Sequence, residues 1–336
     1  MTPQSLRRRP RRPASGFAAR ACAVGLAVVL AAVTANLRLH TPHIAVGGPL
    51  AVHPGPAAPP HDRPSSVDAP QRGAPQPAAV SVPLGPHLNV PVLYYHYIRT
   101  MASTSQDQLG FRLSISPRLF AQQLALLQVE GAHTITLATL MAALAGKAAL
   151  PSHPVVLTFD DGYADFATSA EPVLAQYGFV ATDFVVSGFL GRPGYMTAAQ
   201  VVAMDAAGMV IGSHTVHHVD LVRVSLADAQ TEIDTGKAAL EQLLGHPVLD
   251  FAYPYGGFNS AVVQLLRQAG FRDAVSTMYG DTQSLNGRYL LHRTEIIGGA
   301  SSLASYARDA GLPLPTASQS SLIASLAAQP ASPNSA

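Results

Sequence analysis

The stretch Val155-Val156-Leu157-Thr158-Phe159-Asp160-Asp161-Gly162 places two adjacent carboxylates at the end of an apolar run. We predict a buried strand over Val155–Phe159, because a short apolar run that ends at turn residues is typical of one. Two neighbouring carboxylates repel each other, so a nearby cation is needed to keep both ionised. Asp160 and Asp161 therefore indicate a metal site, unless Asp161-Gly162 merely shapes a turn.

Two histidines later in the chain, within His214-Thr215-Val216-His217-His218, favour the metal site. His214 and His218 are four positions apart and can bind one ion from the same side of a helical turn. His217 points elsewhere under this spacing, so we assign it a structural role. Two His and one Asp suit Zn²⁺ with a position open for water, which leaves the second Asp to act as a base. The only cysteine is Cys22, so a cysteine-rich zinc site is excluded, while Co²⁺, Ni²⁺ and Mn²⁺ remain alternatives.

Short apolar runs alternate with helical segments through the middle of the chain. Several predicted helices open at residues that are favoured as N-caps, namely Ser116, Thr197, Ser225 and Asn259. Repeated strand–helix units predict an α/β fold with a parallel sheet, either a barrel or an open sheet. Asp160, His214 and Tyr255 each follow a different predicted strand, and a barrel brings such positions to one face. This relation favours the barrel.

Composition and the N-terminal sequence indicate where the protein acts. Charged residues make up 12% of the chain, the net charge is +1, and no basic patch marks the folded part, so we predict no nucleic-acid partner. Arginines precede an apolar run over residues 21–35, which is typical of a secretory signal or a signal anchor. We expect an extracytoplasmic protein that is either secreted or anchored to the membrane by its N-terminus.

Four segments are predicted along the chain. Residues 1–40 form the basic N-terminus with its signal or anchor. Residues 41–88 contain 12 of the 27 prolines and indicate a disordered linker. Residues 89–312 form the catalytic domain, and residues 313–336, rich in Ser and Ala, form a flexible tail.

A third stretch, Phe251-Ala252-Tyr253-Pro254-Tyr255-Gly256-Gly257, follows another predicted strand. Its Pro and Gly residues predict a tight turn that can direct a backbone N–H toward developing oxyanion charge. An ordinary strand-to-helix turn has the same composition.

Together these stretches resemble the polysaccharide deacetylase family, also called the NodB-homology or carbohydrate esterase 4 group. Thr158–Gly162 matches the first family motif and His214–His218 the second, while Phe251–Gly256 resembles the third in a Tyr-Pro-Tyr-Gly form. The resemblance covers residues 89–299. It implies a distorted (β/α) barrel of about seven parallel strands.

The resemblance implies a metal-dependent hydrolase that removes N-acetyl groups from GlcNAc-containing cell-wall or extracellular polysaccharide. Asp161, His214 and His218 would bind the metal, and Asp160 would be the base that takes a proton from the activated water. The Tyr255 N–H would stabilise the oxyanion. Two alternatives remain: an esterase that removes O-acetyl groups from a xylan-type polysaccharide, and a non-catalytic glycan-binding module. We expect a monomer.

Two positions depart from the family pattern. Many members carry an Arg early in motif three, where this chain has Ala252, and we hypothesise that Arg293 supplies that charge to the base. Leu290-Leu291-His292 fits the family's Leu-x-His string and implies that His292 is the general acid, although the same residues also fit a plain final strand in which His292 faces away. The chain has no Trp, so a hydrophobic wall would come from residues such as Phe189, Tyr195 or Leu290.

Overall fold

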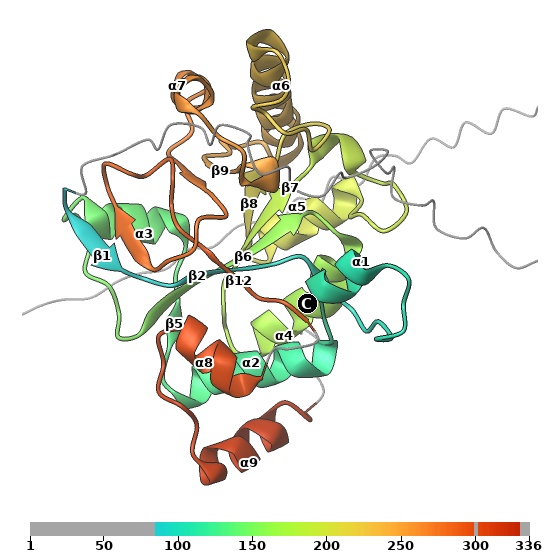
Figure 1. Cartoon of the computed structure of the whole chain (residues 1–336), viewed down its shortest axis with the longest axis vertical. Coiled ribbons are helices and arrows are strands. Elements are labelled where there is room, and N and C mark those ends of the chain that lie inside the picture. Colours follow the sequence, from blue (N-terminus) through green and yellow to red (C-terminus); the bar gives the residue numbers. More distant parts are fainter. Residues whose placement is uncertain (1–84, 299–301, 330–336) are drawn as a thin grey trace, which may run out of the picture. The chain divides into compact units, whose positions relative to one another are not determined.

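A parallel sheet that curls toward a barrel is the centre of the fold (Figure 1). The computed structural model describes residues 85–298 and 302–329. The strand order is β10 (Asp273–Val275), β9 (Asp250–Ala252), β8 (Val210–Ser213), β7 (Thr182–Val185), β6 (Pro154–Asp161), β2 (Val92–Tyr95) and β12 (Thr294–Glu295). All of these neighbours pair in parallel, and β5 (His133–Thr134) pairs with the start of β6. The predicted α/β barrel with seven parallel strands is confirmed.

Two small ladders lie beside the main sheet. They pair β1 (His87–Asn89) with β11 (Thr282–Ser284) and β3 (Tyr97–Ile98) with β4 (Ser114–Ile115).

The segment 291–295 joins the two edges of the main sheet. Leu291 bridges Val275 of β10, and its N–H donates to the Ala274 carbonyl at 3.0 Å. A few residues later, β12 pairs with β2 at the opposite edge. The final strand that the sequence predicts around His292 is therefore shared between two partners, and through it the sheet closes.

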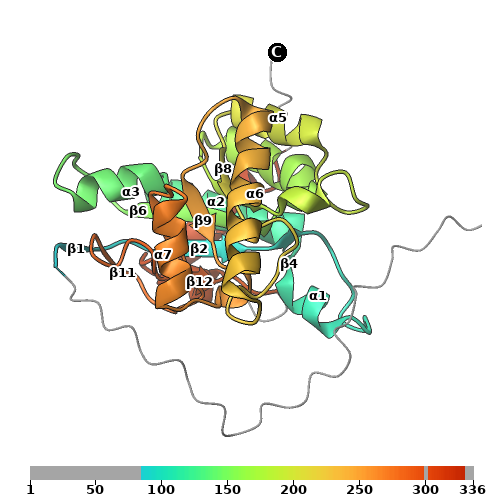
Figure 2. The same cartoon turned by 90° about the horizontal axis from the view of Figure 1, so that it is seen from above.

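Most of the helices cover the outside of the sheet, whereas α3 (Leu137–Leu144) packs against side chains of its inner face. Their bounds are α1 (Gln108–Leu113), α2 (Pro117–Val129), α3 (Leu137–Leu144), α4 (Glu171–Gln176), α5 (Ala198–Ala206), α6 (Leu226–Leu244), α7 (Ser260–Gln268), α8 (Leu303–Asp309) and α9 (Ala317–Leu326). Figure 1 shows α2, α8 and α9 together on one side and α6 with α7 on the other, and Figure 2 shows α6 running past β8. The predicted N-caps of α2, α5, α6 and α7 each accept a backbone hydrogen bond, so these four helix starts are confirmed.

Side chains of β6 alternate between two apolar layers, as strand geometry requires. Leu157 and Phe159 pack in the core cluster that includes the outer helices, whereas Val156 packs in a second cluster with Phe184 and with α3. Gly212 of β8 leaves room for the Phe184 ring, because a Cβ there would lie 2.4 Å from the Phe184 Cδ1. Asp160 follows the parity of Val156 and so faces the barrel interior.

The C-terminal segment differs from the expected flexible tail. Residues 317–326 form α9, which begins at a capping box between Thr316 and Gln319. Ile323 is fully buried, and Gln319 Nε2 donates to Glu130 Oε1 at 2.7 Å. The Ser- and Ala-rich composition conceals this helix because few of its side chains are apolar, and Ile323 and Leu326 are the large ones that pack against the core.

The remaining terminal predictions concern residues 1–84 and 330–336, which lie outside the described residues. Within the described part of the chain, no helix combines the length and the apolar character needed to cross a membrane.

Candidate metal centre

Asp161, His214 and His218 converge beyond the carboxyl ends of β6 and β8. One ligand atom from each side chain lies within 4.8 Å of the others. The Nε2 atoms of His214 and His218 lie 3.5 and 3.2 Å from Asp161 Oδ1. In the sheet, Val185 of β7 pairs with both Asp161 and Ser213, so the ends of β6 and β8 are level. Parallel pairing thus brings the predicted ligand set to one place.

The chemistry of these three side chains fits a divalent cation. Asp161 Oδ1 is buried without a hydrogen-bond partner among the described residues, which ordinarily costs about 1–3 kcal/mol. His214 Nδ1 lies 2.8 Å from the Ala252 carbonyl oxygen and donates to it. This bond leaves the lone pair of Nε2 facing Asp161, the arrangement of a metal-binding imidazole. Two imidazole nitrogens and one carboxylate oxygen form a candidate site for Zn²⁺ or a similar ion.

Charges around the cluster favour a cation. Burial alone would raise the pKa of Asp161, but the neighbouring imidazoles, with His214 and His218 first among them, together lower that pKa below its usual value. Burial alone would lower the pKa of His214, whereas the Asp161 and Asp160 carboxylates raise it. Burial and the neighbouring His214 lower the pKa of His218 to about 4. At neutral pH His218 is therefore unprotonated and able to coordinate an ion.

Asp160 is held by Arg293 in a buried two-point ion pair. The two guanidinium NH groups donate to the two carboxylate oxygens at 2.7 and 2.8 Å, and both residues are at most 5% exposed. Arg293 Nε also donates to the Ser276 carbonyl at 2.9 Å, and the guanidinium lies 4.2 Å from the centre of the Tyr94 ring. Burial would raise the pKa of Asp160, but Arg293, together with smaller contributions from His214 and His96, lowers it below its usual value. This is the contact that the Arg293 hypothesis requires.

Tyr255 and His292 occupy different positions relative to the cluster. The Tyr255 ring is 4.6 Å from the His218 ring between centroids, and its side chain is 68% exposed. His292 lies between Leu291, which bridges Val275, and Arg293, and its backbone N–H donates to Gln283 Oε1 at 3.0 Å. A Cβ at Gly280 would lie 3.1 Å from His292 Nδ1, which places the imidazole against that glycine. The oxyanion role of Tyr255 and the acid role of His292 stay predictions.

His96 is not among the residues that the sequence predicts for the site. It directly follows β2, whose last residue pairs with Phe159, so it is level with Asp160. After burial and the stronger neighbours named above, His96 also contributes to lowering the pKa of both Asp160 and Asp161. Its Nδ1 is buried and has no hydrogen-bond partner among the described residues. The available signal was its position as a polar residue at the end of a strand neighbouring β6.

The backbone of the site is strained. Of the five non-glycine residues with positive φ in the described chain, four lie here: Asp161 (83°), Thr215 (66°), His218 (55°) and Tyr255 (58°). Such conformations cost about 1–3 kcal/mol each and persist only where the surroundings impose them. Gly162 is needed for the same turn, because its φ is 73° and a Cβ would lie 3.3 Å from the Val185 Cα.

An aromatic row extends beside Asp161. Tyr97 stacks on Tyr163 with ring centroids 3.8 Å apart, Tyr195 follows at 5.0 Å from Tyr163, and Phe189 lies 5.0 Å from Tyr195. Burial, and after it the Asp161 charge, raise the pKa of Tyr163 and Tyr195, so both phenols lie within reach of that carboxylate. Phe189 and Tyr195 are thus positioned for the predicted hydrophobic wall.

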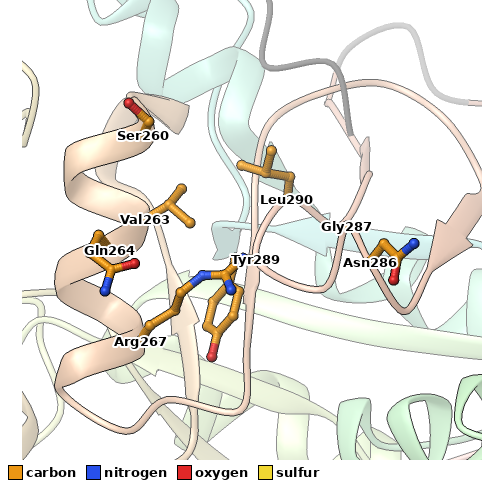
Figure 3. Close-up of a pocket in the computed structure, with 8 residues that line it drawn as sticks. All are labelled: Ser260, Val263, Gln264, Arg267, Asn286, Gly287, Tyr289 and Leu290. Carbon is orange, nitrogen blue, oxygen red and sulfur yellow. The ribbon is translucent and has the colours of Figure 1, made fainter. Parts of the chain in front are cut away.

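Leu290, the third residue predicted for that wall, lies at a different place. It lines a pocket of about 210 Å³ between α7 and the segment that precedes β12 (Figure 3). The Tyr289 ring and the Arg267 side chain line the same pocket, with the guanidinium 4.8 Å from the ring centre. None of the three candidate metal ligands lines this pocket.

Fold and site together define a class of protein, a (β/α) barrel with an Asp-His-His cluster at the carboxyl ends of its strands. The sequence model of the family described as "Polysaccharide deacetylase" matches residues 147–274. YxkH of Bacillus subtilis (strain 168), whose name places it among the polysaccharide deacetylases, is 30% identical over 215 residues, which cover 63% of this chain and 73% of that protein. The chain belongs to the polysaccharide deacetylase family and is an enzyme of that class.

Two further relatives extend the comparison. The Streptococcus pyogenes deacetylase PplD, solved in complex with acetate, is 31% identical with a TM-score of 0.59, and the match covers 64% of this chain and 95% of PplD. The poly-beta-1,6-N-acetyl-D-glucosamine N-deacetylase of Escherichia coli (strain K12) is 28% identical over 108 residues, which are 32% of this chain but only 15% of that protein. The resemblance inferred from the motifs is thus confirmed.

Proposed function

We propose that this enzyme removes N-acetyl groups from a GlcNAc-containing polysaccharide outside the cytoplasm. The observation that carries the proposal is the convergence of Asp161, His214 and His218 beside the Arg293-paired Asp160. The similarity to a protein named for poly-beta-1,6-N-acetyl-D-glucosamine supports an N-acetylated polymer as substrate. The arginine-rich start and the following apolar run support an extracytoplasmic location.

Each residue of the site then has a role. Asp161, His214 and His218 would hold a divalent ion, with Zn²⁺ as the first choice. When bound, such an ion polarises the acetyl carbonyl and increases the acidity of water. Asp160 would accept the proton of the attacking water, because Arg293 keeps it ionised and fixes both of its oxygens. The Tyr255 N–H would donate to the oxyanion that develops on the acetyl group.

The experiment that tests this function compares acetate release by the wild-type protein and by Asp160→Asn. The substitution keeps the shape of the side chain but removes its basicity, so turnover should fall by about 10²–10⁴-fold while bound metal is retained. N-acetylated glucosamine oligomers and acetylated xylan serve as parallel substrates, and acetate release from xylan alone would replace the amide assignment by an ester one. Undiminished turnover by Asp160→Asn would show that Asp160 is not the base.

The proton donor for the leaving amine has two candidates. His292 is the residue predicted from the motif. His96 is the second candidate, because it contributes to lowering the pKa of both Asp160 and Asp161, although their other neighbours contribute more. Replacing the donor by Ala should lower kcat by about 10²–10⁴-fold and should remove the alkaline limb of the pH profile. The other substitution should leave that limb in place. Equal, small effects of His96→Ala and His292→Ala would exclude both.

A further inference from the structure

The loop between the two histidine ligands is bound by one carboxylate of α6. Glu232 Oε2 accepts the backbone N–H groups of Val216 and His217 at 3.0 and 2.8 Å. Its other oxygen lies 2.7 Å from His217 Nδ1, which donates to it. The Glu232 side chain is 13% exposed. Three hydrogen bonds to one largely buried carboxylate are stronger than bonds to a neutral acceptor.

The same face of α6 allows the loop to approach closely. Gly236 lies one helical turn after Glu232, and residues four apart share a helix face. A Cβ at Gly236 would lie 2.9 Å from the Thr215 carbonyl carbon and 3.1 Å from its oxygen. Figure 2 shows α6 passing β8, the strand from which the loop emerges. Helix α6 thus offers a carboxylate and, one turn later, a gap that fits the loop backbone.

The opposite side of the loop is bound as well. The Ser187 N–H donates to the Thr215 carbonyl at 3.1 Å, and the Gly188 N–H donates to the Val216 carbonyl at 3.0 Å. A Cβ at Gly188 would lie 2.5 Å from that second oxygen. Carbonyl groups of the loop therefore bond to the segment after β7, while its N–H groups bond to α6.

This support acts where the backbone is strained. Thr215 and His218 both have positive φ, and Thr215 immediately follows one ligand while His218 is the other. Without an external partner, a loop in this conformation would relax and move the two imidazoles apart. The hydrogen bonds of Glu232 in the described structure go to Val216 and His217, so its action on the ligands is indirect.

We propose that Glu232 is a positioning residue that holds the Thr215–His218 backbone in its ion-binding conformation and so sets the affinity for the metal. The inference rests on the proposed function, in which His214 and His218 bind a divalent ion. Metal affinity is therefore the quantity to measure, separately from turnover.

The test compares Glu232→Ala with Asp234→Ala in the full chain. Asp234 is an exposed acid on the same helix and accepts a 3.4 Å hydrogen bond from Gln230 Nε2, so the control removes the same charge without touching the loop. Zn²⁺ affinity is measured by competition with a chromophoric chelator, and circular dichroism verifies folding. Glu232→Ala should bind Zn²⁺ at least about tenfold more weakly than wild type. Asp234→Ala should stay within about twofold.

Two readouts separate positioning from a general structural effect. Acetate release by Glu232→Ala should require more added Zn²⁺ for half-maximal rate, yet approach the wild-type kcat when Zn²⁺ saturates. Glu232→Gln keeps an acceptor oxygen but loses the charge, so its affinity should fall between those of wild type and Glu232→Ala. If Glu232→Ala does not fold, Glu232→Gln carries the comparison.

The outcomes are distinct for the two proposals. If the wild-type protein binds no Zn²⁺, the proposed metal centre is wrong. A wild-type protein that binds Zn²⁺, together with Glu232 variants that bind it as tightly as Asp234→Ala does, would overturn the positioning role and leave the metal centre intact.

Discussion

Two buried carboxylate pairs lie at opposite ends of the parallel sheet. Asp160 and Asp161 end β6, whereas Asp250 and Asp273 begin β9 and β10 and pair directly across the ladder. Arg272 contacts both members of the second pair, with its Nε 2.9 Å from Asp273. In the first pair, Arg293 binds Asp160 only, and Asp161 keeps an oxygen without a hydrogen-bond partner in the described structure. Asp273 Oδ1 likewise has no hydrogen-bond partner in the described structure, so the two pairs differ in the groups that face them: one arginine contacts both Asp250 and Asp273, whereas Asp161 faces the imidazoles of His214 and His218.

The protonation of the two pairs differs accordingly. Burial, with the Asp250 charge added, raises the pKa of Asp273 well above its usual value despite Arg272. For Asp160 and Asp161, burial acts in the same direction, but Arg293 and the imidazoles lower each pKa instead. Asp273 therefore favours its protonated form, whereas Asp160 and Asp161 favour the ionised form. Burial alone therefore does not determine the direction in which the pKa of a carboxyl group shifts. The charged groups around it determine that direction.

Metal removal should give the largest effect on activity, and it should act through the Asp160–Asp161 pair and not through the Asp250–Asp273 pair. Dialysis against a chelator should reduce acetate release to background, because the open oxygen of Asp161 and the two imidazoles lose their shared ion. Added Zn²⁺ should restore the rate, and it should raise the melting temperature, since an ion that binds only the folded state stabilises that state. Arg272→Ala, a change beside Asp250 and Asp273, is the control, because its acetate release should depend on Zn²⁺ in the same way as that of the wild type. Full activity of the chelated protein would contradict the metal centre.

Replacing each arginine by Ala should give the next largest difference. Arg293→Ala leaves Asp160 buried without its partner, which should cost about 3–5 kcal/mol of unfolding free energy and most of the turnover. The pKa of Asp160 should rise, so the acidic limb of the pH–rate profile should move to higher pH. Arg272→Ala should keep turnover and cost less stability, because Arg272 is 29% exposed and the acids beside it can hold a proton.

Denaturant unfolding at several pH values tests whether the contribution of Asp160 to stability decreases as the pH falls. Its folded pKa lies below the unfolded value of about 4, so its contribution to stability is present above that pH and is lost as the pH falls through the folded pKa. The stability gap between wild type and Arg293→Ala should narrow in acid. A gap that widens in acid would contradict the ion pair as the cause.

Asp273→Asn should give the smallest change in stability. Its pH dependence should be opposite to that of Arg293→Ala. The raised pKa of Asp273 means that wild type loses stability as the pH rises from about 4 toward the folded pKa, since only the folded state keeps the proton. An amide resembles the protonated acid and does not ionise. The stability of Asp273→Asn relative to wild type should therefore increase between pH 4 and pH 8, as read from melting temperatures. A constant difference would show that Asp273 is ionised in the folded protein.

Local patterns were enough to predict that His214 and His218 lie close together and where several helices begin. His214 and His218 are close in sequence, and Ser116 or Thr197 forms its cap within one turn, so short-range spacing determines these features. The contact between Arg293 and Asp160 joins residues 133 positions apart, and only the family resemblance indicated it. His96 and Glu232 escaped prediction because their neighbours depend on strand order and helix docking.

Closure of the sheet has a consequence for how activity first arises. Arg293 is carried by the segment that connects the last strand of the sheet back to β2, so the countercharge of Asp160 arrives only when both edges have met. Under the proposed function, the base would thus gain its countercharge only through the contact that closes the barrel, so we expect hydrolysis of acetyl groups to require the docked segment.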